Sequence, residues 1–427
     1  MSREMKESGI DWIGSIPESW NTIKFKYLHG GMNTGEGIDK NFWSNEPTDR
    51  LFYTAGINPI RTNYEDFPEW KYTKENDLLL ARNGTPYIYI PYPNACYTDH
   101  IIRATMNESV NKRFVQYGLQ CSIASVVVDS VSLATWSASL WNKQVIAWPS
   151  AEEQERIVSF LDEKCAHIDS VLEKTRNSIE EYKKLKQAVI TQTVTKGIRT
   201  DTGRIMKDSG IKWIGEMPDN WKLVPFRRIL KERNEKNSPI KSKERLSLSI
   251  DLGVTLYSEK TTNLDRFKEN FEQYKMAHKG DLVMNSMNMI VGASGQSKYY
   301  GCVSPAYYTF YDETEDHCTA KFCEYVFRSK TMLRILFSLG KGIYAILRGD
   351  DKVNTCRLKV SKEDLKSIVI PVPPLEEQRE ITTFLNEKCN QINKIIEKKE
   401  QFISELEKYK KSLIYEYVTG KKEVPES

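Results

Sequence analysis

The chain has 427 residues, of which 40% are hydrophobic and 28% charged, and its formal net charge is +4. This length permits two or three domains with cores of their own, and the composition is that of an ordinary water-soluble protein. The first residues, MSREMKESGIDW, are polar, and no apolar run long enough to cross a bilayer occurs in the sequence. We therefore expect a cytoplasmic protein without a membrane segment.

An internal repeat organises the sequence. SGIDWIGSIPESW (8–20) returns as SGIKWIGEMPDNW (209–221), 201 residues later, and PSAEEQERIVSFLDEKCAHID (149–169) returns as PPLEEQREITTFLNEKCNQIN (373–393), 224 residues later. Self-similarity of this kind indicates two copies of one structural unit. Because the offset changes between the two blocks, the interior regions differ in length and have diverged while the frames stayed alike.

The two interior regions, residues 21–148 and 222–371, mix strand-like runs with loops and apolar helix-like stretches. Runs rich in β-branched and aromatic residues between turn residues predict strands. The predicted strands are, in chain order, Leu51–Thr54, Asp77–Ala81, Tyr87–Ile90, Ile123–Val128, Asp281–Met284, Ala306–Phe310 and Ser367–Pro371. The predicted helices of the interiors are Lys112–Gln120 and Phe322–Phe337. Each interior is therefore predicted to be a mixed α/β domain with a mostly β core.

A long helix is predicted after each interior region. From Ala151 to about Lys196, and from Leu375 to about Val418, the sequence has no Gly or Pro and is rich in strong helix formers. Apolar residues recur at spacings of three and four, which is the pattern of a coiled coil. The residues predicted to pack between helices are Leu161, Ile168, Leu172, Ile179, Tyr182, Val189, Leu385, Ile392, Ile396, Ile403, Leu406 and Leu413.

Each apolar stripe needs a partner, and the simplest partner is the other helix of the same chain, packed antiparallel. Dimerisation with a second chain is the alternative. The fold class that follows is α+β: two mixed α/β domains separated by two long antiparallel coiled-coil helices and related by a pseudo-twofold repeat. The predicted segments are a first recognition domain (1–148), a first helix (149–198), a linker with a second recognition domain (199–371), and a second helix with the C-terminal tail (372–427).

Several polar side chains near turns have the chemistry of DNA readers. Arg and Lys match guanine edges in the major groove, and Asn and Gln match adenine. The candidates are Arg82, Asn83, Gly84, Thr85, Asn285, Met287, Asn288, Ser294, Gln296, Lys298 and Arg348. The basic residues support this interpretation, since 221–280 contains fourteen Lys or Arg against eight Asp or Glu. The same residues would also suit an ordinary solvated loop whose polar side chains bond its own backbone.

No catalytic or metal site is predicted. The sequence lacks the GxxxxGK[ST] phosphate loop and the [DN]PP[YFW] motif of amino-methyltransferases. Asp99 and His100 are adjacent, but a lone Asp-His pair is common by chance and is not taken as acid–base chemistry. Eight cysteines, at positions 96, 121, 165, 302, 318, 323, 356 and 389, include no CxxC pair. Free, mostly buried thiols in a reducing compartment are expected.

Four motifs in the expected order resemble the specificity subunits of type I restriction–modification systems. They are WIGxxPxxW (12–20 and 213–221), PPLEEQxxIxxFLxEK (373–388, and more loosely 149–164), GDLVMNSMN (280–288) and VSPAYYTF (303–310). The resemblance spans essentially the whole chain. The first domain departs from the pattern, because CYTDHII (96–102) stands where the second domain has VSPAYY.

The resemblance implies a non-catalytic subunit with two target recognition domains, each reading one half of a split, asymmetric site in double-stranded DNA. It also implies that the helices set the spacer and dock methyltransferase subunits, two in number. Motor-nuclease subunits would complete the complex. No cofactor is expected on this chain, because S-adenosylmethionine, and ATP with Mg, belong to the partner subunits.

Two other classes of protein compete with this interpretation. A coiled-coil scaffold joining two protein-binding domains would explain the helices and the repeat, but not why only the interiors diverged. A self-sufficient DNA methyltransferase or nuclease is disfavoured by the missing motifs.

Overall fold

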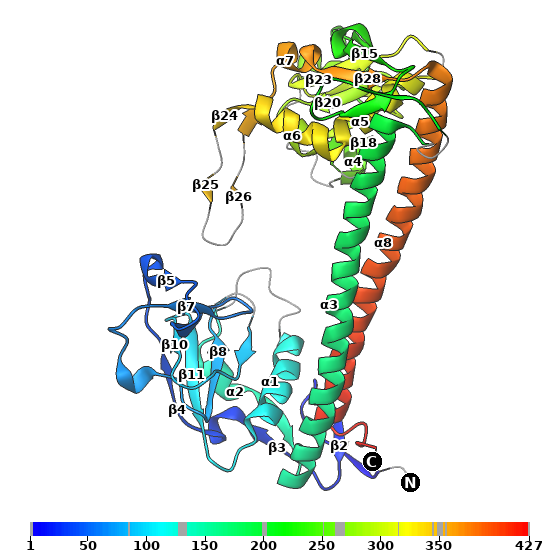
Figure 1. Ribbon diagram of the computed structural model, residues 1–427. Coiled ribbons are helices and arrows are strands. Elements are labelled where there is room, and N and C mark those ends of the chain that lie inside the picture. Colours follow the sequence, from blue (N-terminus) through cyan, green and yellow to red (C-terminus); the bar gives the residue numbers. More distant parts are fainter. Residues whose placement is uncertain are drawn as a thin grey trace. The chain divides into compact units, whose positions relative to one another are not determined.

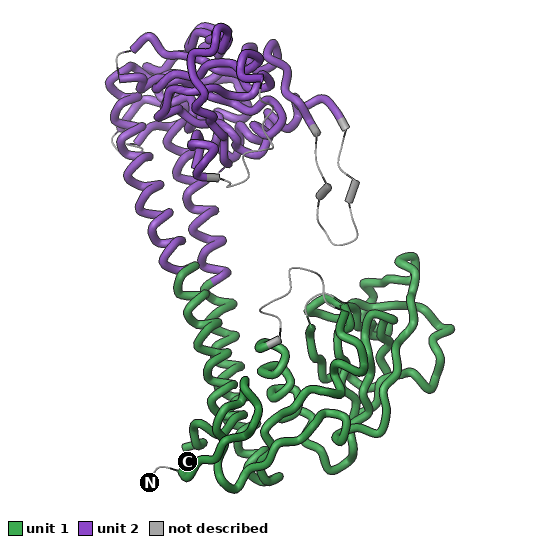
Figure 2. The backbone as a smooth tube through the Cα atoms, turned by 180° about the vertical axis from the view of Figure 1, so that it is seen from behind, with its two compact units in different colours: residues 1–175, 400–427 green, residues 176–399 purple. Residues whose placement is uncertain are grey.

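The structure is a computed structural model that describes residues 3–83, 86–126, 135–198, 203–250, 252–260, 270–314, 316–343, 346–347, 353–354 and 357–425. It divides into two compact units, of which unit 1 comprises residues 1–175 and 400–427 and unit 2 comprises residues 176–399 (Figure 2). Each unit therefore contains one interior region and part of both long helices. None of the helices in the described part of the chain combines the length and apolarity needed to span a membrane.

The two units are built on the same frame, as the repeat predicts. Each begins with an antiparallel hairpin, continues with a strand that pairs with the last strand of the domain, and has a four-stranded sheet at its centre (Figure 1). In unit 1 these are β1 (Met5–Glu7) with β2 (Ser15–Pro17), β3 (Asn21–Lys24) with β12 (Val145–Trp148), and the sheet β4 (His29–Thr34), β11 (Ile101–Met106), β8 (Asp77–Ala81) and β9 (Ile88–Tyr89). In unit 2 they are β13 (Met206–Asp208) with β14 (Glu216–Pro218), β15 (Lys222–Pro225) with β28 (Val369–Val372), and the sheet β16 (Lys231–Glu232), β23 (Tyr307–Tyr311), β20 (Leu282–Asn285) and β21 (Ser294–Gln296).

The interiors differ in what surrounds this sheet. Unit 1 adds a second four-stranded sheet in which β10 (Cys96–Tyr97), β6 (Arg50–Tyr53), β7 (Ile60–Thr62) and β5 (Trp43–Ser44) are neighbours in that order. Unit 2 has instead the pairs β17 (Leu246–Ser249) with β18 (Gly253–Leu256), β19 (Lys275–Ala277) with β22 (Gly301–Val303), β24 (Lys341–Ile343) with β27 (Arg357–Lys359), and β25 (Ile346–Leu347) with β26 (Val353–Asn354). The mixed α/β prediction is confirmed, and the divergence lies outside the shared sheet.

Helices cover one side of each sheet, and two of the sequence predictions fail there. Helix α1 spans Lys112–Val126, so the predicted strand at Ile123–Val128 is wrong for every position that the structure describes. Ile123 is buried together with Leu119, one turn earlier, which shows that its β-branched side chain serves a helix face. The predicted helix at Phe322–Phe337 is two helices, α5 (Cys318–Arg328) and α6 (Lys330–Leu339). They are separated at the extended residue Ser329, whose hydroxyl donates to the carbonyl of Val326 at 2.7 Å.

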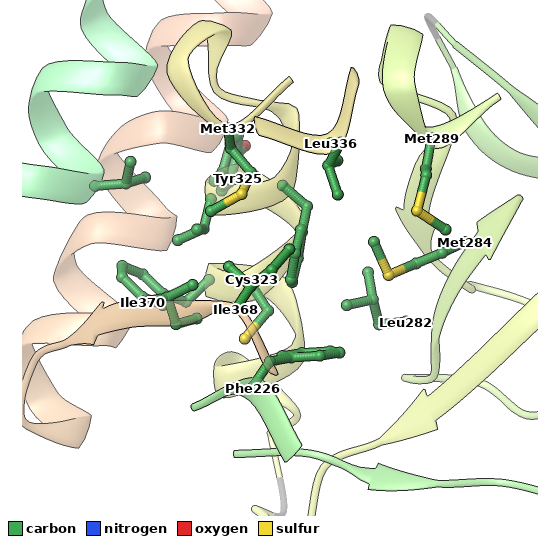
Figure 3. Close-up of a cluster of buried hydrophobic side chains, with 14 of the residues drawn as sticks. Phe226, Leu282, Met284, Met289, Cys323, Tyr325, Met332, Leu336, Ile368 and Ile370 are labelled. Carbon is green, nitrogen blue, oxygen red and sulfur yellow. The ribbon is translucent and has the colours of Figure 1, made fainter. Parts of the chain in front are cut away.

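The core of unit 2 lies between its sheet and these helices (Figure 3). The ring of Phe226, which follows β15, meets the rings of Phe310 and Phe327 edge-on at 4.9 and 4.8 Å. Figure 3 shows side chains of β20, α6 and β28 converging on the same cluster, among them Leu282, Met284, Met332, Leu336 and Ile370. Burial of this apolar surface is the main force that holds the sheet to the helices.

The long helices are α3 (Ala151–Lys196) and α8 (Leu375–Val418), with the bounds that the sequence predicts (Figure 1). In unit 1 Asp169 of α3 accepts from Lys410 of α8 at 2.6 Å. A second contact joins the ring of Phe160, nine residues earlier in α3, to the ring of Tyr417, seven residues later in α8. The two helices therefore run antiparallel in unit 1.

The same pairing occurs in unit 2. Lys186 of α3 donates to Asn393 of α8 at 2.8 Å. The ring of Tyr182, four residues earlier in α3, lies 5.8 Å from the ammonium of Lys399, six residues later in α8. All twelve predicted packing residues are buried or partly buried. The stripe is thus covered by the other helix of the same chain.

A buried tryptophan holds each hairpin to the start of a long helix. In unit 2 the indole N–H of Trp221 donates to Glu377, near the N-terminus of α8, at 2.9 Å, and Arg204 pairs with the same carboxylate at 2.5 Å. Unit 1 repeats the arrangement with Trp20, Glu153 and Arg3, at 2.7 and 2.5 Å. A carboxylate is favourable there because it meets the positive end of the helix dipole.

The tryptophan of each hairpin also meets the end of the other long helix. A glycine in the left-handed conformation follows each helix end: Gly197 after α3, with φ +81°, and Gly420 after α8, with φ +70°. A Cβ on Gly420 would lie 2.5 Å from the ring of Pro17 and 3.1 Å from Trp20. Lys421 donates to the carbonyl of Ser15, 406 residues away in sequence, at 2.8 Å. The hairpin of unit 1 is therefore packed against the last helix of the chain.

The seven cysteines in the described part of the chain are free thiols. All are buried except Cys121, which is partly exposed. Burial raises the pKa of Cys96 and Cys302 to about 11, and that of Cys121 to about 12. A rise of two pKa units lowers the thiolate population near pH 8 by about a hundredfold, and the thiolate is the reactive form.

We expect these thiols to react with iodoacetamide at pH 8 at least about a hundredfold more slowly in the folded chain than after denaturation. Peptide mass spectrometry after a timed pulse of reagent would give the rate for each cysteine, and the denatured chain is the control. Rapid alkylation of Cys96 or Cys302 in the native chain would contradict the burial described here.

Candidate nucleic-acid interface

The predicted reading loop of unit 2 follows β20. The side-chain oxygen of Asn285 accepts the backbone N–H of Met287 at 3.1 Å and that of Asn288 at 3.4 Å, and the residue is buried. Asn285 thus shapes the loop, whereas Met287 and Asn288 are exposed at its tip. Asn285 therefore has the alternative role expected of a polar turn residue, which is to bond the backbone of its own loop.

The next predicted readers lie on and after β21, and they also divide into two groups. Ser294 is buried, and the amide of Gln296 donates to the carbonyls of Gly280 at 3.2 Å and His317 at 2.9 Å. Both side chains are committed to the interior of unit 2. Lys298 is exposed and available to a ligand.

In unit 1 the predicted readers follow β8. Arg82 is exposed, while its backbone is fixed: its N–H donates to the carbonyl of His100 at 2.8 Å, and its own carbonyl accepts from Trp136 at 2.7 Å. The amide nitrogen of Asn83 lies 2.8 Å from Nδ1 of His100. Gly84, Thr85 and, in unit 2, Arg348 lie outside the described residues.

Arg82 borders a hollow in unit 1 of about 460 Å³. Its lining residues come from five separate stretches of the chain and are Met32, Asn33, Thr34, Trp70, Lys71, Arg82, Ile102, Ser137 and Ala138. The indole of Trp70 is 62% exposed, and the ammonium of Lys71 lies 5.1 Å from its ring. Lys71 also pairs with Glu36, and Asn33 accepts from the hydroxyl of Tyr97, whose pKa is raised by burial.

This lining offers what a nucleic acid requires. An ammonium and a guanidinium attract phosphate, an exposed indole can stack on a base or a sugar, and an amide can bond a base edge. Of these residues, only Arg82 is predicted from the sequence. Trp70 and Lys71 are adjacent in an aromatic and basic stretch, EWKY, which is the signal that would have pointed to them.

The same face of the sheet is basic in unit 2. Asp77 and Asp281 each close an equivalent turn, accepting from the backbone N–H three residues earlier, at 2.7 and 2.9 Å. Each Asp is preceded by a lysine six residues earlier, Lys71 at the end of a short helix in unit 1 and Lys275 at the start of β19 in unit 2. A lysine therefore stands shortly before the corresponding turn in both units.

In each unit a short helix forms a second corner of this face. This helix is α2 (Ala138–Lys143) in unit 1 and α7 (Lys362–Ser367) in unit 2. Their N-cap serines, Ser137 and Ser361, accept the backbone N–H three residues on, and they are 224 residues apart. Ala138, which lines the hollow of unit 1, thus corresponds to Lys362 in unit 2. One face of each domain carries aromatic and cationic groups, but the groups differ between the two domains.

Comparisons with known proteins concern the domain family and the fold. A family model described as "Type I restriction modification DNA specificity domain" matches residues 218–405. Among solved structures, a chain from work on complex assembly and conformational transition of the type I R-M system is similar over 94% of this chain and 98% of its own, with a TM-score of 0.64 and 13% identity.

Two further solved structures are similar over most of their length. The HsdS subunit from Thermoanaerobacter tengcongensis covers 95% of this chain and 98% of its own, with a TM-score of 0.46 and 14% identity. The S subunit of a type I restriction-modification system from M. genitalium covers 96% of each chain, with a TM-score of 0.40 and 13% identity.

The family match and the fold therefore agree with the motifs of the sequence. The matched residues contain the reading loop after β20, the face of the sheet beside α7 and most of α8. Residues 218–405 of the chain match the type I restriction modification DNA specificity domain, and the fold is similar to that of a protein studied in the type I R-M system.

Proposed function

We propose that this chain is the sequence-recognition subunit of a type I restriction–modification complex and that it reads a bipartite, asymmetric site in double-stranded DNA. Recognition domains 1–148 and 199–371 each bind one half of the site. The helices at 149–198 and 372–427 set the number of base pairs between the halves. The subunit has no catalytic role of its own.

One observation carries this proposal: the two units share a frame but differ on the corresponding face. The hairpins, the Trp–Glu contacts and the central sheets are matched, whereas the face beside α2 holds Trp70, Lys71 and Arg82 and the face beside α7 holds lysines. Two different reading surfaces on one framework are what a subunit needs to recognise two different half-sites. A scaffold for proteins gives no reason for this division.

The proposed partners are supported by the match to a type I restriction modification DNA specificity domain and by the assembly in which a protein of this fold was studied. We propose that two methyltransferase subunits dock on this chain and that motor-nuclease subunits join the complex. S-adenosylmethionine would be held by the methyltransferases, and ATP with Mg by the motor-nuclease subunits. The chain's part is to position the methyltransferases over adenines at each half-site.

Exchange of residues 21–148 for the corresponding segment of another specificity subunit should change one half-site only. The host genome would be sequenced for modified adenines with the native gene, with the exchanged gene and without the gene. We expect the native gene to produce a split motif, and the exchanged gene to keep one half and the spacer while replacing the other half.

The matched control is an exchange of residues 21–148 for a silent recoding of the same segment, which should leave the whole motif in place. If the exchange altered neither half, or if the motif were the same without the gene, the chain would not be the reading subunit. A scaffold without DNA specificity would give that second result.

A further inference from the structure

Four lysines gather on the face of unit 2 that corresponds to the hollow of unit 1. They come from three elements: β19 supplies Lys275, β27 supplies Lys359, and α7 supplies Lys362 and Lys366. These elements follow different loops, so the cluster is a product of the fold and not of a local run of basic residues.

Two carboxylates lie near this cluster: Glu232, which pairs with its lysines, and Glu363, which acts with Glu232 and Lys362 on Tyr308. Glu232, on β16, pairs with Lys362 through one oxygen and with Lys366 through the other, each at 2.5 Å. Burial would raise the pKa of Glu232, but the two ammonium groups outweigh it and hold that pKa below its usual value. The neighbouring acid Asp364 is engaged elsewhere, with Lys341 at 3.1 Å and with the hydroxyl of Ser361 at 2.8 Å.

Lys275 bonds a backbone carbonyl and has no ion pair with a carboxylate among the described residues. Its ammonium donates to the carbonyl of Tyr307 at 3.0 Å, and it lies 6.0 Å from the ring of Tyr308, whose other neighbour is Lys362 at 5.8 Å. Burial lowers the pKa of Lys275, and the positive charges of Lys362 and Lys359 lower it further against the opposing pull of Glu232. Packing like charges together in this way is unfavourable unless an anion binds.

The cluster lies beside the exposed tip of the reading loop. The backbone N–H of Val360, between Lys359 and α7, donates to the carbonyl of Ser286 at 3.0 Å, and Ser286 precedes Met287 and Asn288. The hydroxyl of Tyr308 donates to the carbonyl of Val360 at 3.1 Å. Backbone contacts thus fix the lysine cluster against the loop that presents side chains to a ligand.

We propose that Lys275, Lys362 and the adjoining Lys359 and Lys366 bind a backbone phosphate of the DNA and so set the position of the loop at Met287 and Asn288 in the groove. The proposal rests on the proposed function, since it names the phosphate contact of the second recognition domain. In unit 1 Lys71 and Arg82 occupy the corresponding face, and there a single ammonium is combined with an exposed indole. Phosphate contacts position a protein on DNA, and base contacts specify the sequence.

Titration of duplex DNA into the full chain over a range of NaCl concentrations tests the proposal. Two 30-base-pair probes would be used, one of random sequence and one containing the motif mapped in the host genome, with fluorescence anisotropy as the readout. The variants are Lys275→Gln and Lys362→Gln. Lys212→Gln is the control, because Lys212 is an exposed lysine of the hairpin of unit 2 and is remote in sequence from the cluster.

We expect each cluster variant to bind both probes more weakly by the same factor. We also expect the slope of log affinity against log salt to become shallower by about 0.9 for each phosphate that the variant no longer neutralises. The control should keep the slope and affinity of the native chain. Lys275→Arg and Lys362→Arg keep the charge and should show the native slope. A native slope in these variants would show that the Gln variants bind weakly because a charge is missing and not because the chain is misfolded.

Three results would overturn the proposal. They are a native slope in both Gln variants, a weakening confined to the probe with the motif, and Arg variants that fail to restore binding although their thermal unfolding is native. If the native chain binds neither probe, the proposed function fails as well. If the native chain binds and the Gln variants behave as the control does, the recognition role stands and the phosphate site does not.

Discussion

Replacing Trp221 with alanine is expected to destabilise unit 2 by about 3–5 kcal/mol, the usual cost of removing a buried large aromatic side chain. Trp221 is 1% exposed, packs in the core of unit 2 and donates to Glu377 at 2.9 Å. Its removal leaves a cavity between the hairpin and the helices, and it leaves a partly buried carboxylate without one of its donors. This is a large fraction of the stability of an ordinary domain.

The effect should be measured locally, because a chain with two units need not unfold in one step. Hydrogen exchange followed by mass spectrometry would report the strand pair β15 and β28, whose amides are protected only while unit 2 is folded. Trp70→Ala is the matched control, since that indole is 62% exposed and its removal should change stability by no more than about 0.5 kcal/mol. Equal protection in Trp221→Ala and the native chain would show that the tryptophan is dispensable.

Inserting one heptad into each long helix is expected to lengthen the spacer of the DNA site by about 3 base pairs and to leave both half-sites unchanged. Seven residues add about 10 Å to a helix at ~1.5 Å per residue, and DNA rises ~3.4 Å per base pair. The insertions belong between Thr175 and Arg176 in α3 and between Ile403 and Ser404 in α8. These positions face each other in the register that the pairs Asp169–Lys410 and Lys186–Asn393 share.

A heptad is used because it returns the apolar stripe to nearly the same side of the helix. The control replaces seven residues on each helix with the inserted sequence without changing the length, and its modified motif should keep the native spacer. Mapping of modified adenines reads both variants. A native spacer in the lengthened chain would show that the helices do not measure the site.

The long helices could be predicted closely because their determinants are local. Each begins within two residues of a proline, has two acidic residues in its first turn, and continues without a breaker for more than forty residues. The β-branched run at Ile123 misled the prediction for the opposite reason. There the burial of Ile123 and Leu119 against the sheet decided in favour of a helix, and tertiary contacts of that kind are not visible in a short window of sequence.

The sequence alone identifies fewer residues of the candidate interface, and the physical reason is similar. Amides near turns have the chemistry of DNA readers, but Asn285 and Gln296 bond backbone groups of their own unit. A lone sequence cannot tell which polar turn side chains are already satisfied. The hollow of unit 1 and the lysine cluster of unit 2 each combine residues that are far apart in sequence, so only the folded chain brings Lys71 to Arg82 or Lys275 to Lys362.

The junction at Trp20 has a consequence for the way in which the chain is connected. In unit 2 the helix end at Gly197 and the hairpin that receives it belong to one continuous stretch of polypeptide, whereas in unit 1 the corresponding helix end at Gly420 reaches its hairpin only through packing and the bond from Lys421 to Ser15. One junction is thus covalent and its counterpart is not, yet both have the same form. Within unit 1, packing around Trp20 and the bond from Lys421 therefore hold a helix end that chain connectivity holds at Gly197 in unit 2.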